Sequence, residues 1–140
     1  MLRVLLVEDN RFDAMLVTSK LAGVAEVSHA PSMAAAIHYA TDKLFDVVIL
    51  DLNLGDGTEN AVQAFVQRSR RPMPLLVYSG HELNQEDAAW VDGALPKPAS
   101  KEDLVRAIRR IVIKVDEEYT AQTVQRLRSV VGGLQRLAAM

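Results

Sequence analysis

Three carboxylates in this sequence directly follow short apolar runs. Glu8 and Asp9 follow the run at residues 4–7, and Asp51 follows the run at residues 47–50. Carboxylates that are brought together repel one another and resist ionisation unless a cation lies between them. A hard divalent cation with oxygen ligands removes this penalty, and Mg²⁺ is the natural choice because it keeps several of its waters. The first chemistry that the sequence indicates is therefore a magnesium site.

A hydroxyl and an amine follow two further segments. Ser79 follows the apolar run at residues 75–78, and Lys97 comes just after a weaker run at residues 94–95. An ammonium is a compact charge that suits a phosphoryl oxygen, and a hydroxyl can donate a hydrogen bond to the same group. A carboxylate nucleophile such as Asp51, a metal, a cation and a hydroxyl donor together suit phosphoryl transfer. An acidic pair alone is more often a solvated loop, so the joint occurrence carries this interpretation.

These side chains need a scaffold that brings the ends of separate strands together. The runs at residues 4–7, 47–50 and 75–78 are apolar throughout, which is typical of strands buried on both faces of a parallel sheet. Weaker strand candidates lie at residues 24–27 and 94–95. Helical spacing follows in four intervals, three of which begin at good N-cap residues: Asn10 onward, Ser32 to Lys43, residues 59–69, and Ser100 onward.

The order of these elements predicts an α/β fold. Strands that alternate with helices imply a parallel sheet with helices on both of its faces. In open sheets of this class, ligands bind at the carboxyl ends of the strands. Glu8, Asp51 and Ser79 all lie just past such ends, so the expected fold brings the candidate site together.

The whole-chain composition excludes several classes of protein. The sequence has 140 residues, which indicates one domain, and 49% of them are apolar. Its net charge of −2 argues against a nucleic-acid partner held by phosphate contacts. The sequence has no cysteine, so disulfide scaffolds, thiolate catalysis and cysteine-based zinc sites are excluded. The apolar runs are too short to span a membrane and the start lacks a signal peptide, so we expect a cytoplasmic protein without a membrane partner.

Four sequence blocks resemble the signature blocks of response regulator receiver domains, the CheY-like family. The blocks are residues 4–10, 49–54, 78–80 and 95–98, and the resemblance extends over about residues 2–114. It implies a flavodoxin-like, doubly wound, five-stranded parallel sheet.

The resemblance also implies roles for individual residues. Asp51 is the expected phosphoacceptor, Ser79 takes the conserved hydroxyl position, and Lys97 takes the position of the conserved lysine. The expected ligands of Mg²⁺ are Glu8, Asp9, Asp51 and the main-chain carbonyl of Asn53.

By the same resemblance, the chain is expected to be a single-domain response regulator of a two-component phosphorelay. A sensor histidine kinase or a histidine phosphotransfer protein would supply the phosphoryl group. The chain would catalyse only its own phosphorylation and dephosphorylation, so it is not expected to be an enzyme for another substrate. Output is expected through contact with an unknown downstream protein, without direct nucleic-acid binding.

The main alternative is a phosphorylation-independent binding module of the same fold. A phosphatase is disfavoured because the sequence supplies no further acid, base or substrate pocket.

Three departures from the family pattern affect how a signal would be transmitted. Gly55 stands where Pro is common, Ala94 stands where Tyr or Phe is common, and the interval at residues 79–97 is short enough to trim the fourth helix. These features are similar to the atypical receivers of the alphaproteobacterial general stress response. Those receivers carry a T-G-aromatic type motif where this chain has Ser79-Gly80-His81. We therefore expect the signal to pass through this loop and the short fourth helix.

Two residues beside the expected phosphoryl site are candidates for modulating dephosphorylation. His81 lies two residues after Ser79, where it would orient or block the hydrolytic water; the alternative is an exposed loop histidine. Asn53 lies two residues after Asp51, and the alternative is that only its carbonyl matters. Trp90 is expected to pack the short fourth helix onto the sheet.

The C-terminal part of the chain has a different pattern. We expect a receiver domain at residues 1–114 and a helical extension at residues 115–140. The apolar residues of the extension are spaced as an a/d stripe of about two heptads: Val124, Leu127, Val131, Leu134 and Ala138. Gly132 and Gly133 interrupt the stripe, and each costs about 1 kcal/mol inside a helix. Three interpretations stay open: a coiled coil that forms a homodimer, a cover over the domain, and a truncated linker to an output domain.

Overall fold

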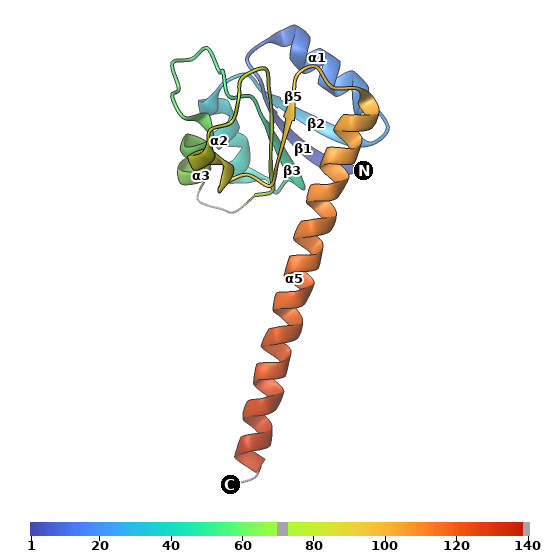
Figure 1. Cartoon of the computed structure of the whole chain (residues 1–140), viewed down its shortest axis with the longest axis vertical. Coiled ribbons are helices and arrows are strands. Elements are labelled where there is room, and N and C mark those ends of the chain that lie inside the picture. The colour runs from blue at the N-terminus through green and yellow to red at the C-terminus, as the bar shows by residue number, and fades with distance from the viewer. Residues whose placement is uncertain (70–72, 139–140) are drawn as a thin grey trace.

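The computed structural model of the chain describes residues 1–69 and 73–138, and the side chains of all of these except residues 133–138. Strands and helices alternate along these residues, as the sequence predicts (Figure 1). The strands are β1 (Leu2–Val7), β2 (Ala25–Ala30), β3 (Val47–Leu50), β4 (Leu75–Ser79) and β5 (Gly93–Pro96). The helices are α1 (Arg11–Lys20), α2 (Met33–Asp42), α3 (Ala61–Ser69), α4 (Gln85–Ala88) and α5 (Lys101–Ala138).

The five strands form one parallel sheet in the order β2-β1-β3-β4-β5. Every residue of β3 and β4 is buried, which agrees with their continuous apolar sequences. The strand order is that of flavodoxin-like doubly wound proteins, so the predicted fold class is confirmed. Because all strands run the same way, their carboxyl ends lie at one edge of the sheet.

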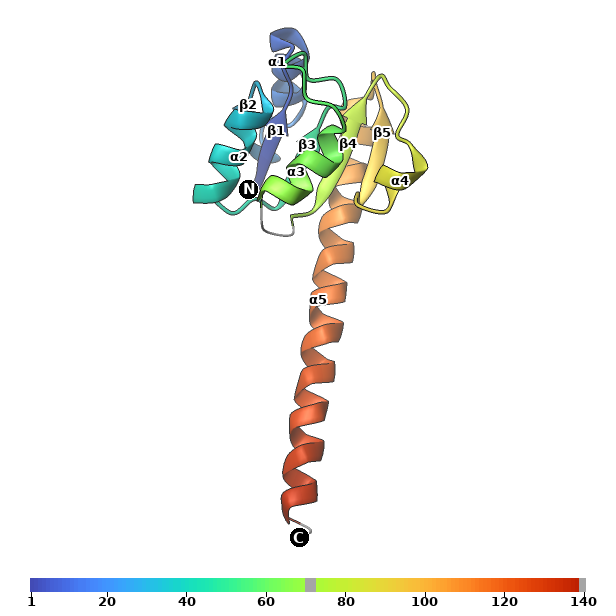
Figure 2. The same cartoon turned by 90° about the vertical axis from the view of Figure 1, so that its left-hand side faces the viewer.

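Helices cover both faces of the sheet, which Figures 1 and 2 show from two sides. α1 and the first part of α5 pack on one face, where Leu6 and Ile108 belong to the same buried core. α2 and α3 pack on the other face, where Leu5 and Phe65 lie in a second core. Successive residues of β1 thus point to opposite faces, as the pleat of a strand requires.

The three predicted N-caps are confirmed. Asn10 Oδ1 accepts hydrogen bonds from the backbone N–H groups of Phe12 and Asp13, both at 3.0 Å, at the start of α1. Ser32 and Ser100 each accept one such bond at the starts of α2 and α5. These bonds satisfy backbone donors that have no partner within the helix.

The fourth helix is reduced to a single turn, α4, as the short interval before Lys97 predicts. Trp90 lies just after this turn and is 58% exposed, so the prediction that it packs the helix onto the sheet is wrong. The partly buried Leu83 and Val91 pack against the core on this side instead. One turn of helix shields little of the sheet, and Ala94 of β5 is exposed.

α1 turns its small apolar residues toward the sheet. Ala14 and Val17 are buried, whereas the large side chains of Phe12, Met15 and Leu16 are exposed. These three residues form an apolar surface beside the carboxyl end of β1, which we call the α1 surface.

α5 extends far beyond the sheet (Figures 1 and 2). Its first turns are anchored by Leu104, Ile108 and Ile111, which are buried. Every residue from Asp116 to Val131 is exposed, and the boundary predicted after residue 114 falls inside this one continuous helix. Two stripe residues, Leu134 and Ala138, lie outside the described side chains. Among the described residues, none of the helices combines the length and apolar character needed to cross a membrane.

Candidate functional site

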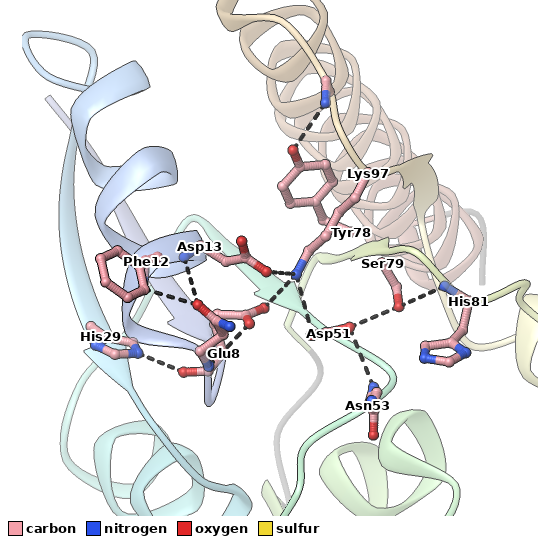
Figure 3. Close-up of polar contacts among 12 residues, drawn as sticks. Glu8, Phe12, Asp13, His29, Asp51, Asn53, Tyr78, Ser79, His81 and Lys97 are labelled. Carbon is pink, nitrogen blue, oxygen red and sulfur yellow. Dashed lines mark hydrogen bonds and ion pairs between the residues drawn. The ribbon is translucent and has the colours of Figure 1, made fainter.

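The candidate site lies at the edge of the sheet where β1, β3 and β4 end. Val7 pairs with Leu50 in the parallel register, so the next residues of the two strands, Glu8 and Asp51, emerge side by side. Ser79 ends β4 beside them. Glu8, Asp51 and Ser79 are all buried although they are polar, and Figure 3 shows their side chains converging. The structure therefore brings the predicted residues of three strands into one place.

Three carboxylates in this place can share a cation. Glu8, Asp9 and Asp51 each offer an oxygen, and these oxygens lie within 4.8 Å of one another. A set made only of carboxylate oxygens fits the hard-ligand preference of Mg²⁺, so the residues present suit the predicted ion. Asn53 lies next to this set, because its backbone N–H donates to Asp51 Oδ1 at 3.3 Å. Its carbonyl as a fourth ligand stays a prediction.

The Lys97 ammonium lies among the carboxylates. Its Nζ donates to Glu8 Oε2 at 2.8 Å and to Asp51 Oδ2 at 3.3 Å (Figure 3). A third ion pair joins Nζ to Asp13 Oδ2 at 3.0 Å. A partly buried lysine is thus balanced by three acidic side chains.

Lys97 is held in this position by residues of β4 and by the loop after β5. Its backbone N–H donates to the Ser79 carbonyl at 3.0 Å, and its peptide bond to Pro98 is cis. The Tyr78 ring lies beside the lysine side chain, with Nζ 5.7 Å from the ring centroid. The Tyr78 hydroxyl accepts a hydrogen bond from the Ala99 N–H at 3.0 Å, which ties the loop to β4.

Ser79 connects the acidic site to the next loop. Its Oγ donates to Asp51 Oδ1 at 2.7 Å, and the same Oγ accepts a hydrogen bond from the backbone N–H of His81 at 3.2 Å. A change at the Asp51 carboxylate can therefore alter the hydrogen bond of the His81 N–H, because both groups bond to the same hydroxyl. Figure 3 shows this chain running from Asp51 to His81.

The protonation of the site follows from its burial and its charges. The pKa of Glu8 is raised to about 7, mainly by burial and to a smaller extent by the adjacent Asp51, against the opposing effect of Lys97. Burial also acts to raise the pKa of Asp51, but hydrogen bonds from Ser79, Glu8 and Asn53 outweigh burial and leave the pKa below its ordinary value. At neutral pH Asp51 is therefore ionised, whereas Glu8 is near the midpoint of its titration.

The pKa of Lys97 moves the opposite way from what burial alone would do. Burial lowers the pKa of this amine, but the hydrogen bonds to Glu8 and Asp13 outweigh burial and raise it above the ordinary lysine value. Lys97 is thus a permanent positive charge at any physiological pH.

Gly55 allows the loop after β3 to approach the acidic site. A Cβ atom at this position would lie 2.7 Å from Asp9 Oδ2, which is closer than such atoms come in proteins. A side chain at this position would therefore displace the Asp9 carboxylate from where it lies. The neighbouring Asp56 fixes the loop from the other side, because its carboxylate accepts hydrogen bonds from the N–H groups of Met33 and Thr58, both at 3.0 Å.

Two cavities flank the loop after β4. One, of about 290 Å³, is lined by residues that include Ser79, His81 and Ala94. The other, of about 260 Å³, is lined by residues that include Asn53 and His81. Both predicted modulating residues, Asn53 and His81, therefore line cavities beside groups that hydrogen-bond to Asp51. Their effect on dephosphorylation stays a prediction.

Sequence reasoning missed two residues of the site. Asp13 contacts Lys97, and its only sequence signal is its place in the first turn of a helix that starts at the acidic edge. The second is His29, whose Nε2 lies 2.6 Å from the backbone carbonyl of Glu8 (Figure 3). This contact fixes the main chain that carries a predicted metal ligand, and the sequence offers no signal for it.

Comparisons with known proteins agree with this arrangement. The sequence profile described as the response regulator receiver domain matches residues 4–109. A solved CheY-like receiver domain of a response regulator from Methanospirillum hungatei has a TM-score of 0.73 and 20% identity, and the match covers 84% of this chain and 98% of that one.

Two further solved structures contain a bound metal ion. The receiver domain of a sensor histidine kinase from Pseudomonas aeruginosa, with a magnesium ion coordinated in its active site cleft, has a TM-score of 0.67 and 19% identity over 79% of this chain and 97% of that one. A response regulator from Burkholderia pseudomallei with a phosphorylated aspartic acid, a calcium ion and citrate has a TM-score of 0.67 and 22% identity over 87% of this chain and 75% of that one. At these identities the likeness shows a shared fold. A comparison with curated proteins finds no match.

Proposed function

Because the chain belongs to the response regulator receiver domain family, we propose that it is a phosphorelay receiver whose phosphoacceptor is Asp51. One observation carries the proposal. The buried Asp51 carboxylate is contacted at the same time by the Ser79 hydroxyl and the Lys97 ammonium, beside two further carboxylates. A purely structural aspartate has no need of a hydroxyl, an ammonium and an acidic neighbour set together.

The proposed reaction transfers a phosphoryl group from a phosphohistidine. A carboxylate oxygen of Asp51 attacks the phosphorus in line, and the bond between phosphorus and the imidazole nitrogen breaks. The electron pair of that bond stays on the nitrogen. In the later hydrolysis a water oxygen attacks the phosphorus, the acyl phosphate bond breaks, and inorganic phosphate leaves with the Asp51 carboxylate restored. The chain thus acts only on its own aspartate.

Each polar group of the site has a part in this reaction. Glu8, Asp9, Asp51 and the Asn53 carbonyl would hold Mg²⁺, which when bound offsets negative charge on the phosphoryl oxygens. Lys97 contributes a fixed positive charge at the same oxygens, and Ser79 contributes a hydrogen bond. Both groups already contact Asp51, so they are placed to contact a phosphoryl group that Asp51 carries.

The exposed α1 surface suits the docking of the phosphoryl donor. Phe12, Met15 and Leu16 are exposed apolar residues beside the carboxyl end of β1, where Glu8 lies. A sensor histidine kinase or histidine phosphotransfer protein must bring its phosphohistidine against Asp51, so its surface must pass over this rim. Contiguous exposed apolar side chains favour a protein partner there.

The signal would leave the site through the loop after β4. Ala94 lacks the aromatic ring that could turn toward Ser79, and instead a cavity lies between Ser79, His81 and Ala94. Phosphorylation would pull Ser79 toward the phosphoryl group and change the hydrogen bond that Ser79 accepts from His81. A downstream protein that contacts this loop and α4 would read the change. We assign the chain to the cytoplasm as part of this proposal.

The test is the mass of the intact protein after incubation with Mg²⁺ and acetyl phosphate. The natural chain should gain about one phosphoryl group, and Asp51→Asn should gain none. Glu59→Gln is the matched control, because Glu59 is an exposed carboxylate of the same loop and should leave phosphorylation unchanged. If the natural chain gains nothing and also fails to bind beryllofluoride, the proposal fails and the phosphorylation-independent binding module replaces it.

A further inference from the structure

From Asp116 to Val131, α5 projects away from its own domain. Residues from Asp116 to Val131 are exposed on all sides, and both views show the helix pointing away from the sheet (Figures 1 and 2). Single helices without tertiary packing are only marginally stable in water. A second surface would stabilise the projecting helix, and the domain supplies none for the residues from Asp116 to Val131.

The projecting helix carries an apolar stripe along one side. Val124, Leu127 and Val131 are spaced by three and four residues and are between 41% and 60% exposed. In heptad terms Val124 and Val131 take position a, and Leu127 takes position d. The sequence continues the repeat with Leu134 and Ala138.

We propose that this stripe pairs with the same stripe of a second copy in a parallel two-stranded coiled coil. Valine at position a with leucine at position d is the combination that favours two parallel strands. In such a pair each Val124 faces Val124 of the other copy, and Leu127 faces Leu127. The occupant is a second copy because a helix with an identical repeat matches this spacing without any shift.

The residues that flank the stripe are compatible with self-pairing. Positions e and g of the described heptads hold Ala121, Thr123, Arg128 and Val130, so Arg128 is their only charged residue. In a parallel pair Arg128 lies opposite Thr123 of the other copy, and no like charges meet there. Nothing at these positions selects for a partner of different charge.

The residues that break the apolar pattern show where the pairing begins and which breaks lie outside the contact. Glu117 falls at position a, where it would face Glu117 of the other copy, so the two helices should separate on the side of the domain. Thr120 at position d marks the first neutral layer. Gly132 falls at position b and Gly133 at position c, both away from the contact. The glycines thus reduce helix propensity without leaving holes in the stripe.

The size of the contact predicts a weak dimer. From Thr120 to Ala138 the helix rises about 27 Å, and its contact face is about 10 Å wide. Two such faces amount to on the order of 500 Å² in projection. Stable interfaces bury at least about 1,200 Å² of accessible surface. The dimer should therefore form and dissociate within the concentration range of ordinary biophysical experiments.

Sedimentation equilibrium of the full chain between roughly 5 μM and roughly 500 μM tests the proposal. The average mass should rise from the monomer value of 15.4 kDa toward twice that value. Leu127→Asp should remain monomeric over the same range. Ser129→Asp is the matched control, because it adds the same charge at position f of the same turn and should behave like the natural chain.

A single introduced cysteine tests the direction of the pairing, because the chain has no cysteine of its own. Under mild oxidation Val124→Cys should form a covalent dimer, whereas Ser129→Cys should form at least five-fold less. A monomer at every concentration, a trimer, or efficient cross-linking of both variants would overturn the proposal. Asp51→Asn should dimerise like the natural chain. A failure of the phosphoryl-transfer proposal therefore leaves this one standing, and the reverse also holds.

Discussion

Glu8 must lose a proton before it can bind a metal ion. Because burial raises its pKa to about 7, a proton competes with Mg²⁺ for this carboxylate below neutral pH. The fraction of ionised Glu8 is about ten-fold lower at pH 6 than at pH 8. We therefore expect the affinity of the protein for Mg²⁺, measured by isothermal titration calorimetry, to be about ten-fold weaker at pH 6 than at pH 8.

Two variants of this site separate the proton from the loss of a ligand. Glu8→Gln removes both a ligand and the titrating group, so its Mg²⁺ affinity should be weak and nearly independent of pH between 6 and 8. Asp9→Asn removes a ligand but keeps Glu8, so its affinity should be weak and should still fall toward pH 6. An affinity of the natural chain that stays constant over this range would contradict the assignment of the proton to Glu8.

The same pKa has an opposite effect on the stability of the metal-free protein. A carboxyl group whose pKa is raised in the folded state stabilises the fold at low pH, and this contribution is lost as the pH rises through about 7. Without Mg²⁺, the ionised Glu8 carboxylate therefore destabilises the folded protein at pH 8. Binding of a cation there should restore stability, which links the site to the fold.

At the scale of single residues, the sequence predicted the site residues at the ends of strands and missed those that tertiary contacts bring to the site. Glu8, Asp51 and Ser79 were found because a strand is visible in a short apolar run and its end is a fixed place. Asp13 reaches Lys97 across 84 positions, and His29 contacts the backbone of Glu8. Such contacts depend on how a helix or a neighbouring strand is placed, and no local pattern records them.

At the scale of the elements, the loop after β3 is fastened to the start of α2 by one side chain. Asp56 accepts hydrogen bonds from Thr58 and from the first N–H of α2, that of Met33, and these bonds lower its pKa. We expect Asp56→Ala to lower the free energy of unfolding by about 0.5–1 kcal/mol, as the loss of a helix cap does. Urea denaturation at pH 7 measures this difference.

The pH dependence and a second variant check the cause. A carboxylate with a lowered pKa stabilises the fold above its unfolded pKa of about 3.8, and this contribution is lost as the pH falls through the folded value. The difference between Asp56→Ala and the natural chain should therefore shrink below pH 4. Asp42→Ala is the control, because Asp42 is an exposed carboxylate at the unfavourable, carboxyl end of the same helix. Equal losses in both variants would exclude a role in capping.

The elements themselves followed closely from the sequence. Asn10, Ser32 and Ser100 act as caps because the side-chain oxygens of these residue types bond to the free N–H groups of a first helical turn. Asp56 lies in a turn with Gly57, whose φ is +80°. Its bond to a different helix was not visible, because loops place their side chains by tertiary contact. Trp90 was misplaced for the same reason.

At the scale of the whole molecule, the projecting part of α5 should be dispensable for folding. Residues from Asp116 to Val131 bury nothing against the domain, so a chain that ends after Val115 should unfold within about 2 °C of the full chain at low concentration. A chain that ends after Ala107 would lose the buried Ile108 and Ile111 and should be strongly destabilised. Thermal unfolding followed by circular dichroism distinguishes the two. An early transition of the chain ending after Val115 would show that the extension supports the domain.

The extension was predicted as a helical segment from residue 115, and in the structure this segment continues α5 without a break. The sequence from Val112 to Val131 contains no glycine or proline, so nothing in it ends the helix that begins at Lys101. The apolar spacing predicted the stripe, but it did not predict that the stripe would lie beyond the edge of the domain. That outcome depends on how far the sheet extends, which is a property of the fold and not of the helix.

The long helix also governs how the molecule moves through water. It rises about 34 Å beyond the point where it leaves a domain whose radius of gyration is about 13 Å. A body of this shape tumbles slowly and unequally about its axes, and gel filtration should assign it a mass well above 15.4 kDa even as a monomer. Nuclear relaxation should report a long rotational correlation time for the sheet, because the sheet turns together with the rod attached to it. An early elution volume is therefore no evidence that this chain associates. Association has to be measured by a method whose mass does not depend on molecular shape.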